Sequence, residues 1–343
     1  MQKKELNFAA ISRYRSEIMG IACLWVILHH FQGDIPFFTL RRLSVYGNAG
    51  VDIFLFISGI GLFFSFQKKQ SLASFYKKRL VRLLLPYIFI CVPFFVWRSL
   101  YLGQGNLWLD ITQLSFPLSR MITTWYVPAI LSFYLFFPLV YKLQNNKKVG
   151  NRNILVIFFS VAYLIVLLVF KNVFPVFYGN VEIALTRFVI FFIGCFFGKM
   201  VYEKKPLSVE YVALGGAYII IWVLLRETTD LSNFWIRLSY GPLAISISLL
   251  AAYLFCFLKN NNILLILLRF FGDHSLEVYL THVLIYNIWR NILGVRYLSS
   301  TGRLDYLVVV AIAIVVSVIV HFLVSKLSYL MLKKEHRIID SNQ

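Results

Sequence analysis

Two adjacent histidines, His29 and His30, end the first long apolar segment of the chain, residues 16–32. An ionisable group is costly in hydrocarbon and usually persists there for function. Asp52 lies near the start of the next apolar segment, and His282 lies within a late one. An imidazole beside a carboxylate suits general-base chemistry, because the carboxylate fixes the tautomer and raises the basicity. His30, Asp52 and His282 are therefore candidates for one site.

Each of these residues also has a structural reading that the sequence leaves open. In this reading Asp52 caps a helix, and His282 hydrogen-bonds a neighbouring helix. His29 then faces lipid headgroups or water. Adjacent helical residues point about 100° apart, so only one of His29 and His30 is expected to face a shared site.

A basic segment spans residues 75–86 and contains Arg79 and Arg82. Residues three apart share one face of a helix, so these two guanidinium groups can grip a polyanion such as a phosphate group. The alternative is an ordinary cytoplasmic anchor of the kind that sets the orientation of membrane helices.

Two further groups of polar and aromatic residues are candidates for substrate binding. Ser275, Tyr279 and His282 are spaced i, i+4 and i+7, which places one polar stripe on an apolar helix and favours a cavity wall over a lipid-facing surface. Trp125 and Tyr126 form either an aromatic belt at the membrane interface or the wall of a sugar-binding mouth.

The composition indicates the elements that must position these residues. Of the 343 residues, 59% are hydrophobic and 14% are charged, with a mean hydropathy of +0.74, as expected of a polytopic membrane protein. The net charge is +19. Lys and Arg in cytoplasmic loops explain this charge better than nucleic-acid binding does. The four cysteines lie in apolar runs without metal-site spacing, so no metal is predicted.

Segments long enough to cross a bilayer, about 20 apolar residues each, number about ten. They lie near residues 16–32, 47–66, 83–101, 124–143, 153–170, 184–201, 209–226, 240–258, 272–290 and 306–330. We expect an all-α membrane bundle in which residues 1–343 form one domain. Alternating loop charge predicts that both termini are cytoplasmic. His30 then lies roughly 21 Å along its helix toward the outer side.

Two shorter features have packing interpretations. Residues 263–268 are too few to span a bilayer and are expected to form an interfacial or re-entrant helix before the ninth span. Gly194 and Gly198 have the spacing of a small-residue packing pair in the sixth span.

Taken together, these motifs resemble the acyltransferase family 3 integral-membrane acyltransferases, which O-acetylate bacterial surface polysaccharides and related glycans. The resemblance covers nearly the whole chain. It depends on five segments in order: residues 21–30, residues 50–59, the group Lys78, Arg79, Arg82 and Pro86, the group Trp125 to Val127 with Tyr134 and Pro138, and residues 275–282.

The resemblance implies a multi-pass protein of a bacterial plasma or inner membrane. It implies an acetyl-CoA donor bound from the cytoplasmic side and a carbohydrate acceptor presented on the outer side. His30 matches the family's catalytic histidine and would act as general base, with Asp52 as its candidate partner. Arg79 and Arg82 would hold CoA phosphates, and Tyr279 and His282 would line the site.

The chain departs from the family pattern at one position. The family has an arginine eleven residues before the catalytic histidine, where this chain has Met19. Arg15 lies one helical turn earlier and about 40° away around the helix, so it is the candidate replacement. The alternatives are a different donor or a loss of activity.

Two other readings of the function remain open: a transporter or flippase for a glycan or lipid-linked glycan, and a non-catalytic partner in glycan assembly.

Overall fold

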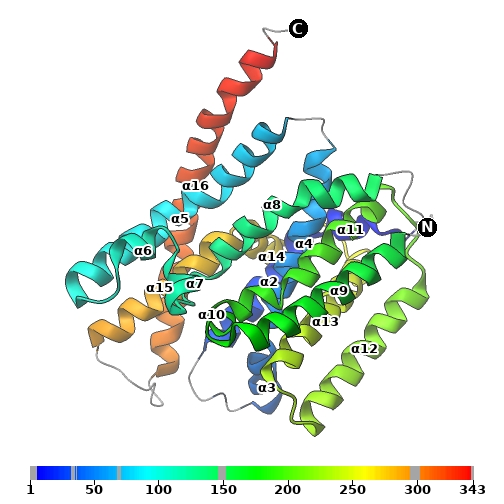
Figure 1. The fold of residues 1–343 in the computed structure, drawn as a ribbon, viewed down its shortest axis with the longest axis horizontal. Helices are drawn as coiled ribbons and strands as arrows, with labels where there is room; N and C mark the ends of the chain where they lie inside the picture. Colours follow the sequence, from blue (N-terminus) through cyan, green and yellow to red (C-terminus); the bar gives the residue numbers. More distant parts are fainter. Residues whose placement is uncertain are drawn as a thin grey trace.

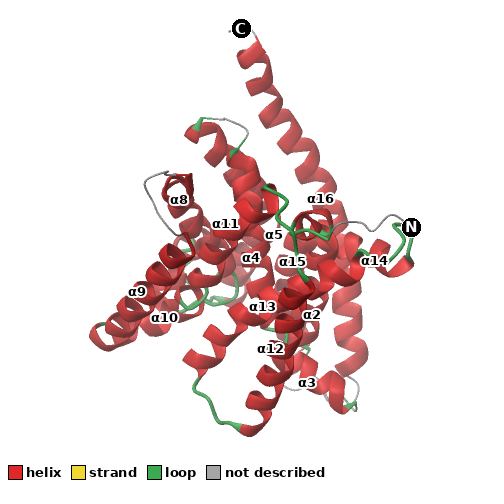
Figure 2. Ribbon diagram, turned by 90° about the vertical axis from the view of Figure 1, so that its right-hand side faces the viewer, coloured by secondary structure: helices red, strands yellow, loops and turns green. Residues whose placement is uncertain are grey.

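The computed structural model describes residues 6–31, 35, 37–67, 71–145, 152–293 and 302–340. These residues form helices and no named strand, which confirms the expected all-α bundle (Figure 2). The helices are α1 (Ala9–Arg13), α2 (Arg15–His30), α3 (Phe38–Tyr46), α4 (Ala49–Phe66), α5 (Leu72–Leu102), α6 (Leu107–Ile111), α7 (Ser115–Ser119), α8 (Tyr126–Asn145), α9 (Arg152–Val173), α10 (Pro175–Leu185), α11 (Phe188–Tyr202), α12 (Val209–Thr228), α13 (Asn233–Phe255), α14 (Ile263–Asp273), α15 (Ser275–Leu293) and α16 (Gly302–Asp340).

Within the described residues, eight helical stretches are long and apolar enough to cross a membrane, fewer than the ten spans expected. The two differences are α2, which has only 16 residues, and α15, which contains Glu277, His282 and Arg290. Both helices pack among other helices. Helix α2 packs against α4 and α14, and α15 packs against α5 and α16. Because protein surrounds much of their surface, they retain polar residues that lipid would disfavour.

Helix α4 lies in the middle of the bundle, between α2, α11 and α13 (Figure 1). In its membrane-span window 72% of the residues are buried, whereas in that of α9 only 6% are buried although its mean hydropathy is 2.8. An apolar helix that packs on so little protein is suited to contact with lipid tails. The core of the protein is therefore built on α4, and α9 lies at its margin.

Close approach of α4 and α11 depends on glycine. A Cβ on Gly59 of α4 would lie 2.5 Å from the carbonyl oxygen of Phe191, and a Cβ on Gly194 would clash with the carbonyl of Phe56. A Cβ on Gly198 would lie 2.5 Å from Cβ of Phe63. The predicted packing pair, Gly194 and Gly198, thus lies at the α4–α11 interface, where small residues let two backbones approach.

Helix α14 is the short helix expected before the ninth span. It packs along α2, where Arg269 pairs with Glu17 at 2.7 Å and the Ser16 hydroxyl donates to Asp273 at 2.6 Å. The chain then turns at His274 and continues into α15. Ser16, near the start of the described chain, and Ser328, near the end of α16, line one cavity.

We expect Gly59→Ala to lower the stability of the protein by about 1–3 kcal/mol, because the new methyl group overpacks the α4–α11 contact. Gly216→Ala is the matched control, since a Cβ at Gly216 of α12 meets no atom within 4 Å. Thermal unfolding of both variants in detergent measures the difference. Equal melting temperatures for the two variants would contradict the close approach of the helices.

Candidate functional site

His30 and His282 come together at the centre of the candidate site. Nδ1 of His30 lies 3.0 Å from Nε2 of His282, and the two ring centroids are 5.0 Å apart. His282 is 1% exposed, whereas His30 is only partly buried. The structure thus joins two of the three ionisable residues that the sequence placed at one site, from α2 and α15.

Backbone carbonyls assign the tautomers of this histidine pair. Nδ1 of His30 lies 3.0 Å from the Val26 carbonyl, and Nδ1 of His282 lies 2.7 Å from the Val278 carbonyl. A carbonyl oxygen only accepts, so in the neutral pair both Nδ1 atoms bear the hydrogen. Nε2 of His282 then accepts from Nδ1–H of His30. Nε2 of His30 keeps its lone pair, and no described residue hydrogen-bonds to it.

His29 has a different environment from His30. Its Nδ1 lies 2.8 Å from the Ser44 carbonyl in α3, on the segment that connects α2 to α4. Trp25 also donates to this segment, at 2.7 Å to the Leu43 carbonyl. His29 therefore holds α3 against α2, while His30 faces α15.

Asp52 lies in a buried ion pair with Arg187 rather than in a hydrogen bond to His30. Nε of Arg187 lies 3.2 Å from Oδ2 of Asp52, and the two side chains are 0% and 1% exposed. Arg187 also donates to the Asn48 side chain and to the Ile183 carbonyl, each at 3.0 Å. The sequence expected Asp52 beside the catalytic histidine, but the stronger attraction of a buried carboxylate is to a full positive charge.

Arg187 is a residue that the sequence reasoning missed. It lies between α10 and α11, where the helical run of the expected sixth span is interrupted. The Ile183 carbonyl, in the last turn of α10, accepts from Arg187, because backbone groups near a helix break at membrane depth require a protein partner. An arginine inside an apolar run was a signal available in the sequence, since such residues are rarely without a partner.

Trp125 belongs to the Arg187 cluster. The guanidinium carbon of Arg187 lies 5.2 Å from the centre of a Trp125 ring, in cation–π range, and Trp125 is 5% exposed. The ring of Trp125, which was predicted to bind substrate, thus lies against the buried arginine.

The predicted cofactor-binding arginines meet in one cavity of about 800 Å³, named here the Arg79 cavity. Its walls come from the beginnings of α2, α5 and α15 and from the later part of α16. The predicted site residues among its lining are Arg15, Arg79, Arg82, Tyr126 and Ser275. Because α5 begins at Leu72, Arg79 and Arg82 lie on one helix, as their spacing predicted.

Two of these arginines have unsatisfied donors in the cavity. The Nε atoms of Arg15 and Arg79 are buried and have no hydrogen-bond partner. Arg82 lies within electrostatic range of both. Buried donors without partners on clustered cations are costly, and anionic oxygens are strong acceptors for guanidinium groups. Met19 and Arg15 both line this cavity.

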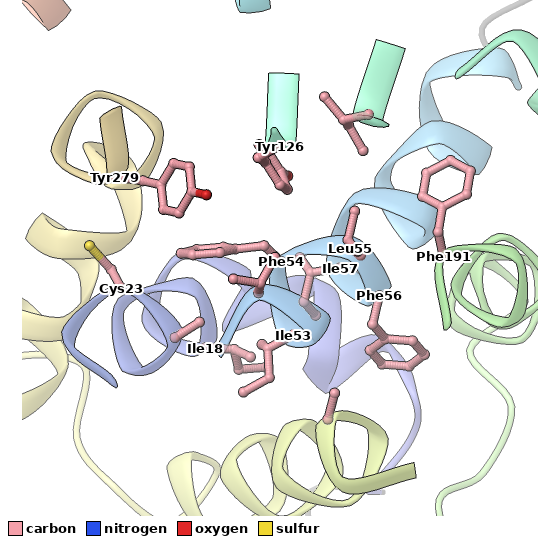
Figure 3. Packing of buried hydrophobic residues seen from close by; sticks show 14 of the residues in the cluster. Ile18, Cys23, Ile53, Phe54, Leu55, Phe56, Ile57, Tyr126, Phe191 and Tyr279 are labelled. Atoms are coloured by element: carbon pink, nitrogen blue, oxygen red, sulfur yellow. The ribbon is translucent and has the colours of Figure 1, made fainter. Parts of the chain in front are cut away.

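A small void of about 40 Å³, named here the neck, adjoins the Arg79 cavity. It shares Met19, Tyr126 and Ser275 with the cavity and is also bounded by Phe54 and Tyr279. The rings of Tyr126 and Tyr279 are 5.4 Å apart, and Figure 3 shows these two side chains near Phe54. The Tyr279 ring is in turn 6.1 Å from that of His282.

A second cavity, of about 600 Å³, lies at the other end of α15 and is named here the Trp97 cavity. It is lined by the end of α5, the segment 104–123 and the end of α15. Along α15, Ser275 lines the Arg79 cavity, His282 contacts His30, and Asn287 lines the Trp97 cavity. At 1.5 Å per residue these positions are about 10 and 8 Å apart along the helix axis, so the histidine pair lies between the cavities.

Potential metal ligands do not gather in the described part of the chain. No group of three or more His, Cys, Asp or Glu side chains there is placed to hold a metal ion. His321, which pairs with Glu277 at 3.2 Å, and His274, whose ring is 4.5 Å from that of His321, line the Arg79 cavity.

We expect Arg187→Ala to destabilise the protein by about 3–5 kcal/mol, because Asp52 would remain buried without its partner. Lys205→Ala is the control, since the pair of Lys205 with Glu203 is 3.9 Å long and its side chains are 51% and 40% exposed. The control is expected to change stability by less than about 1 kcal/mol. Denaturation of both variants in the same detergent tests the difference, and a native-like Arg187→Ala variant would argue against the ion pair.

The comparison with protein families identifies the family of the chain. A family model described as an acyltransferase domain, of the acyltransferase 3 type, matches residues 19–325, which include every predicted site residue except Arg15. Comparison with curated proteins and with solved structures gave no match. Because the family match covers most of the chain, this multi-pass membrane protein belongs to the acyltransferase 3 family.

Proposed function

We propose that the protein transfers an acetyl or similarly small acyl group from acyl-CoA to a hydroxyl group of a cell-surface glycan. One observation supports this proposal above others: a basic cavity and a polar cavity open at opposite ends of α15, and the histidine pair lies between them. A transfer reaction with its donor and acceptor on opposite sides of a membrane needs such an arrangement.

The shape and charge of the Arg79 cavity suit an acyl-CoA donor. Arg15, Arg79 and Arg82 are placed to contact the phosphates, with guanidinium groups that match phosphate geometry. The neck beside Tyr126 and Tyr279 is narrow and mostly apolar. A nucleotide head would therefore remain in the cavity while the thin pantetheine arm extends through the neck and brings the thioester toward His30.

His30 has the free nitrogen that the reaction requires. Its Nε2 accepts the proton of the acceptor hydroxyl as the oxygen attacks the thioester carbonyl carbon. The tetrahedral intermediate collapses, the carbon–sulfur bond breaks, and the proton passes to the departing thiolate to give an ester and free CoA. His282 holds the His30 ring through Nδ1 and stabilises its protonated form, as an orienting partner does in other general-base pairs.

Loop charge supports the orientation that this reaction needs. Basic residues gather at the end of the bundle that contains the Arg79 cavity, among them Lys77, Lys78, Arg79 and Arg82, which is typical of a cytoplasmic face. Acyl-CoA would then enter from the cytoplasm, and the Trp97 cavity would face the outside of a bacterial plasma membrane. The acceptor would meet the acyl group near His30.

We expect acetyl-CoA, but not free acetate, to raise the melting temperature of the detergent-purified protein. At about 100 times the dissociation constant the ligand should add about 2.7 kcal/mol of stability. Arg15→Gln and Arg79→Gln should each weaken this binding about tenfold or more, because each removes a charge-assisted contact. Arg13→Gln is the matched control, since Arg13 is exposed and does not line the cavity. If the Arg79 variant binds acetyl-CoA with unchanged affinity, Arg79 does not bind the donor and serves only to set the orientation of α5 in the membrane.

We expect His30→Ala to abolish acyl transfer and to leave acetyl-CoA binding intact. His29→Gln, next to it, should retain transfer because it keeps a donor for the Ser44 carbonyl. His282→Ala should lower kcat about 100-fold or more with little change in KM for acetyl-CoA, since it removes the partner of the base. Acylation of the cell's glycan measures all three variants. Full glycan acylation in cells with His30→Ala would contradict the enzymatic proposal and favour a transport or structural role.

A further inference from the structure

The Trp97 cavity has an unbalanced charge. Its described lining contains three arginines, Arg98, Arg120 and Arg290, and one carboxylate, Asp110. Asp110 pairs with Arg98 at 3.4 Å, and its side chain is 3% exposed. This carboxylate is therefore occupied by one arginine.

Arg120 and Arg290 have no carboxylate partner within the described chain. Arg120 ends α7 in the left-handed backbone conformation, with φ of 57°, and Arg290 lies in the last turn of α15. Both residues are exposed and both line the cavity. The walls of this polar cavity thus contain two guanidinium groups that no carboxylate neutralises, and Arg290 also has a hydrogen bond with the Tyr286 side chain.

The remaining lining suits a sugar. Trp97, which is partly buried and stacked on Tyr101, supplies an aromatic surface on which the C–H face of a sugar ring can pack, and the buried Phe94 packs beside it. Amide groups around them can donate to and accept from hydroxyls. These amides belong to Gln104, Asn106, Asn287 and Asn291. An aromatic face, neutral amides and arginines without a carboxylate partner together favour a molecule that is both a carbohydrate and an anion.

We propose that the Trp97 cavity binds an anionic saccharide, one with a carboxylate or phosphate group, and that Arg120 and Arg290 contact this group. The inference rests on the proposed function in one respect, since it makes this saccharide the acceptor of the acyl group. Asn287 lies only about 8 Å along α15 from His282, so a hydroxyl group of the bound saccharide lies on the side of the cavity nearest the catalytic base.

Calorimetric titration of the full-length protein in detergent, at fixed ionic strength, tests this proposal. The probes are a glucuronic-acid disaccharide, its carboxyl-reduced neutral counterpart, glucose 1-phosphate, inorganic phosphate, acetate and micelles of phosphatidylglycerol. An anionic sugar is expected to bind about tenfold or more tightly than the neutral one. Whether the carboxylate or the phosphate sugar binds better then identifies the anionic group.

Arg120→Gln and Arg290→Gln should each remove most of this preference and leave binding of the neutral disaccharide nearly unchanged. Arg42→Gln is the matched control, because Arg42 is 45% exposed, pairs with Glu227 and lies outside the cavity. An unchanged acetyl-CoA thermal shift in each variant shows that the fold is intact.

Equal binding of neutral and anionic sugars would overturn the proposal, as would binding of phosphate or acetate as tight as that of the sugars. Binding of phosphatidylglycerol in place of any sugar would also overturn it. The acyl-transfer proposal fails on a different result. If the protein does not bind acetyl-CoA but still binds the anionic sugar through Arg120 and Arg290, the proposed donor is wrong and the saccharide site stands.

Discussion

The ion pair between Asp52 and Arg187 is the constraint on which the rest of the site depends. Both side chains are excluded from solvent, so each needs the other to remain charged. Through this pair and the Asn48 contact, the interruption between α10 and α11 is tied to the start of α4. Helix α4 then packs on α2, which supports His30, and α2 packs on α15, which supports His282.

Helix α15 organises the chemistry along one axis. Its first turn borders the Arg79 cavity, its middle holds His282 against His30, and its end borders the Trp97 cavity. Few apolar membrane helices contain so many polar residues, and α15 keeps them because α2, α5 and α16 cover it. The same packing explains why α15, although its 19 residues are long enough, is too polar to count as a membrane span.

Several parts of the fold and site follow from sequence patterns. Apolar run length predicted the all-α membrane bundle, and the spacing of Gly194 and Gly198 predicted a close helix contact. The three-residue spacing of Arg79 and Arg82 predicted a shared face, and both line one cavity. Other features were missed. Arg187 was overlooked although an arginine in an apolar run was visible in the sequence, and its contact with Trp125 joins residues 62 positions apart.

What the sequence by itself determined is local: helices, their apolar faces, and the residue types that can act as base, phosphate ligand or cavity wall. These follow from helical periodicity and from the cost of polar groups in hydrocarbon. Only the tertiary structure decided the partners. His30 is 252 residues from His282, and Asp52 is 135 residues from Arg187, so no spacing rule relates them. Their pairing depends on which helices pack together and at what depth, and this is set by the close contacts of α2, α4 and α11.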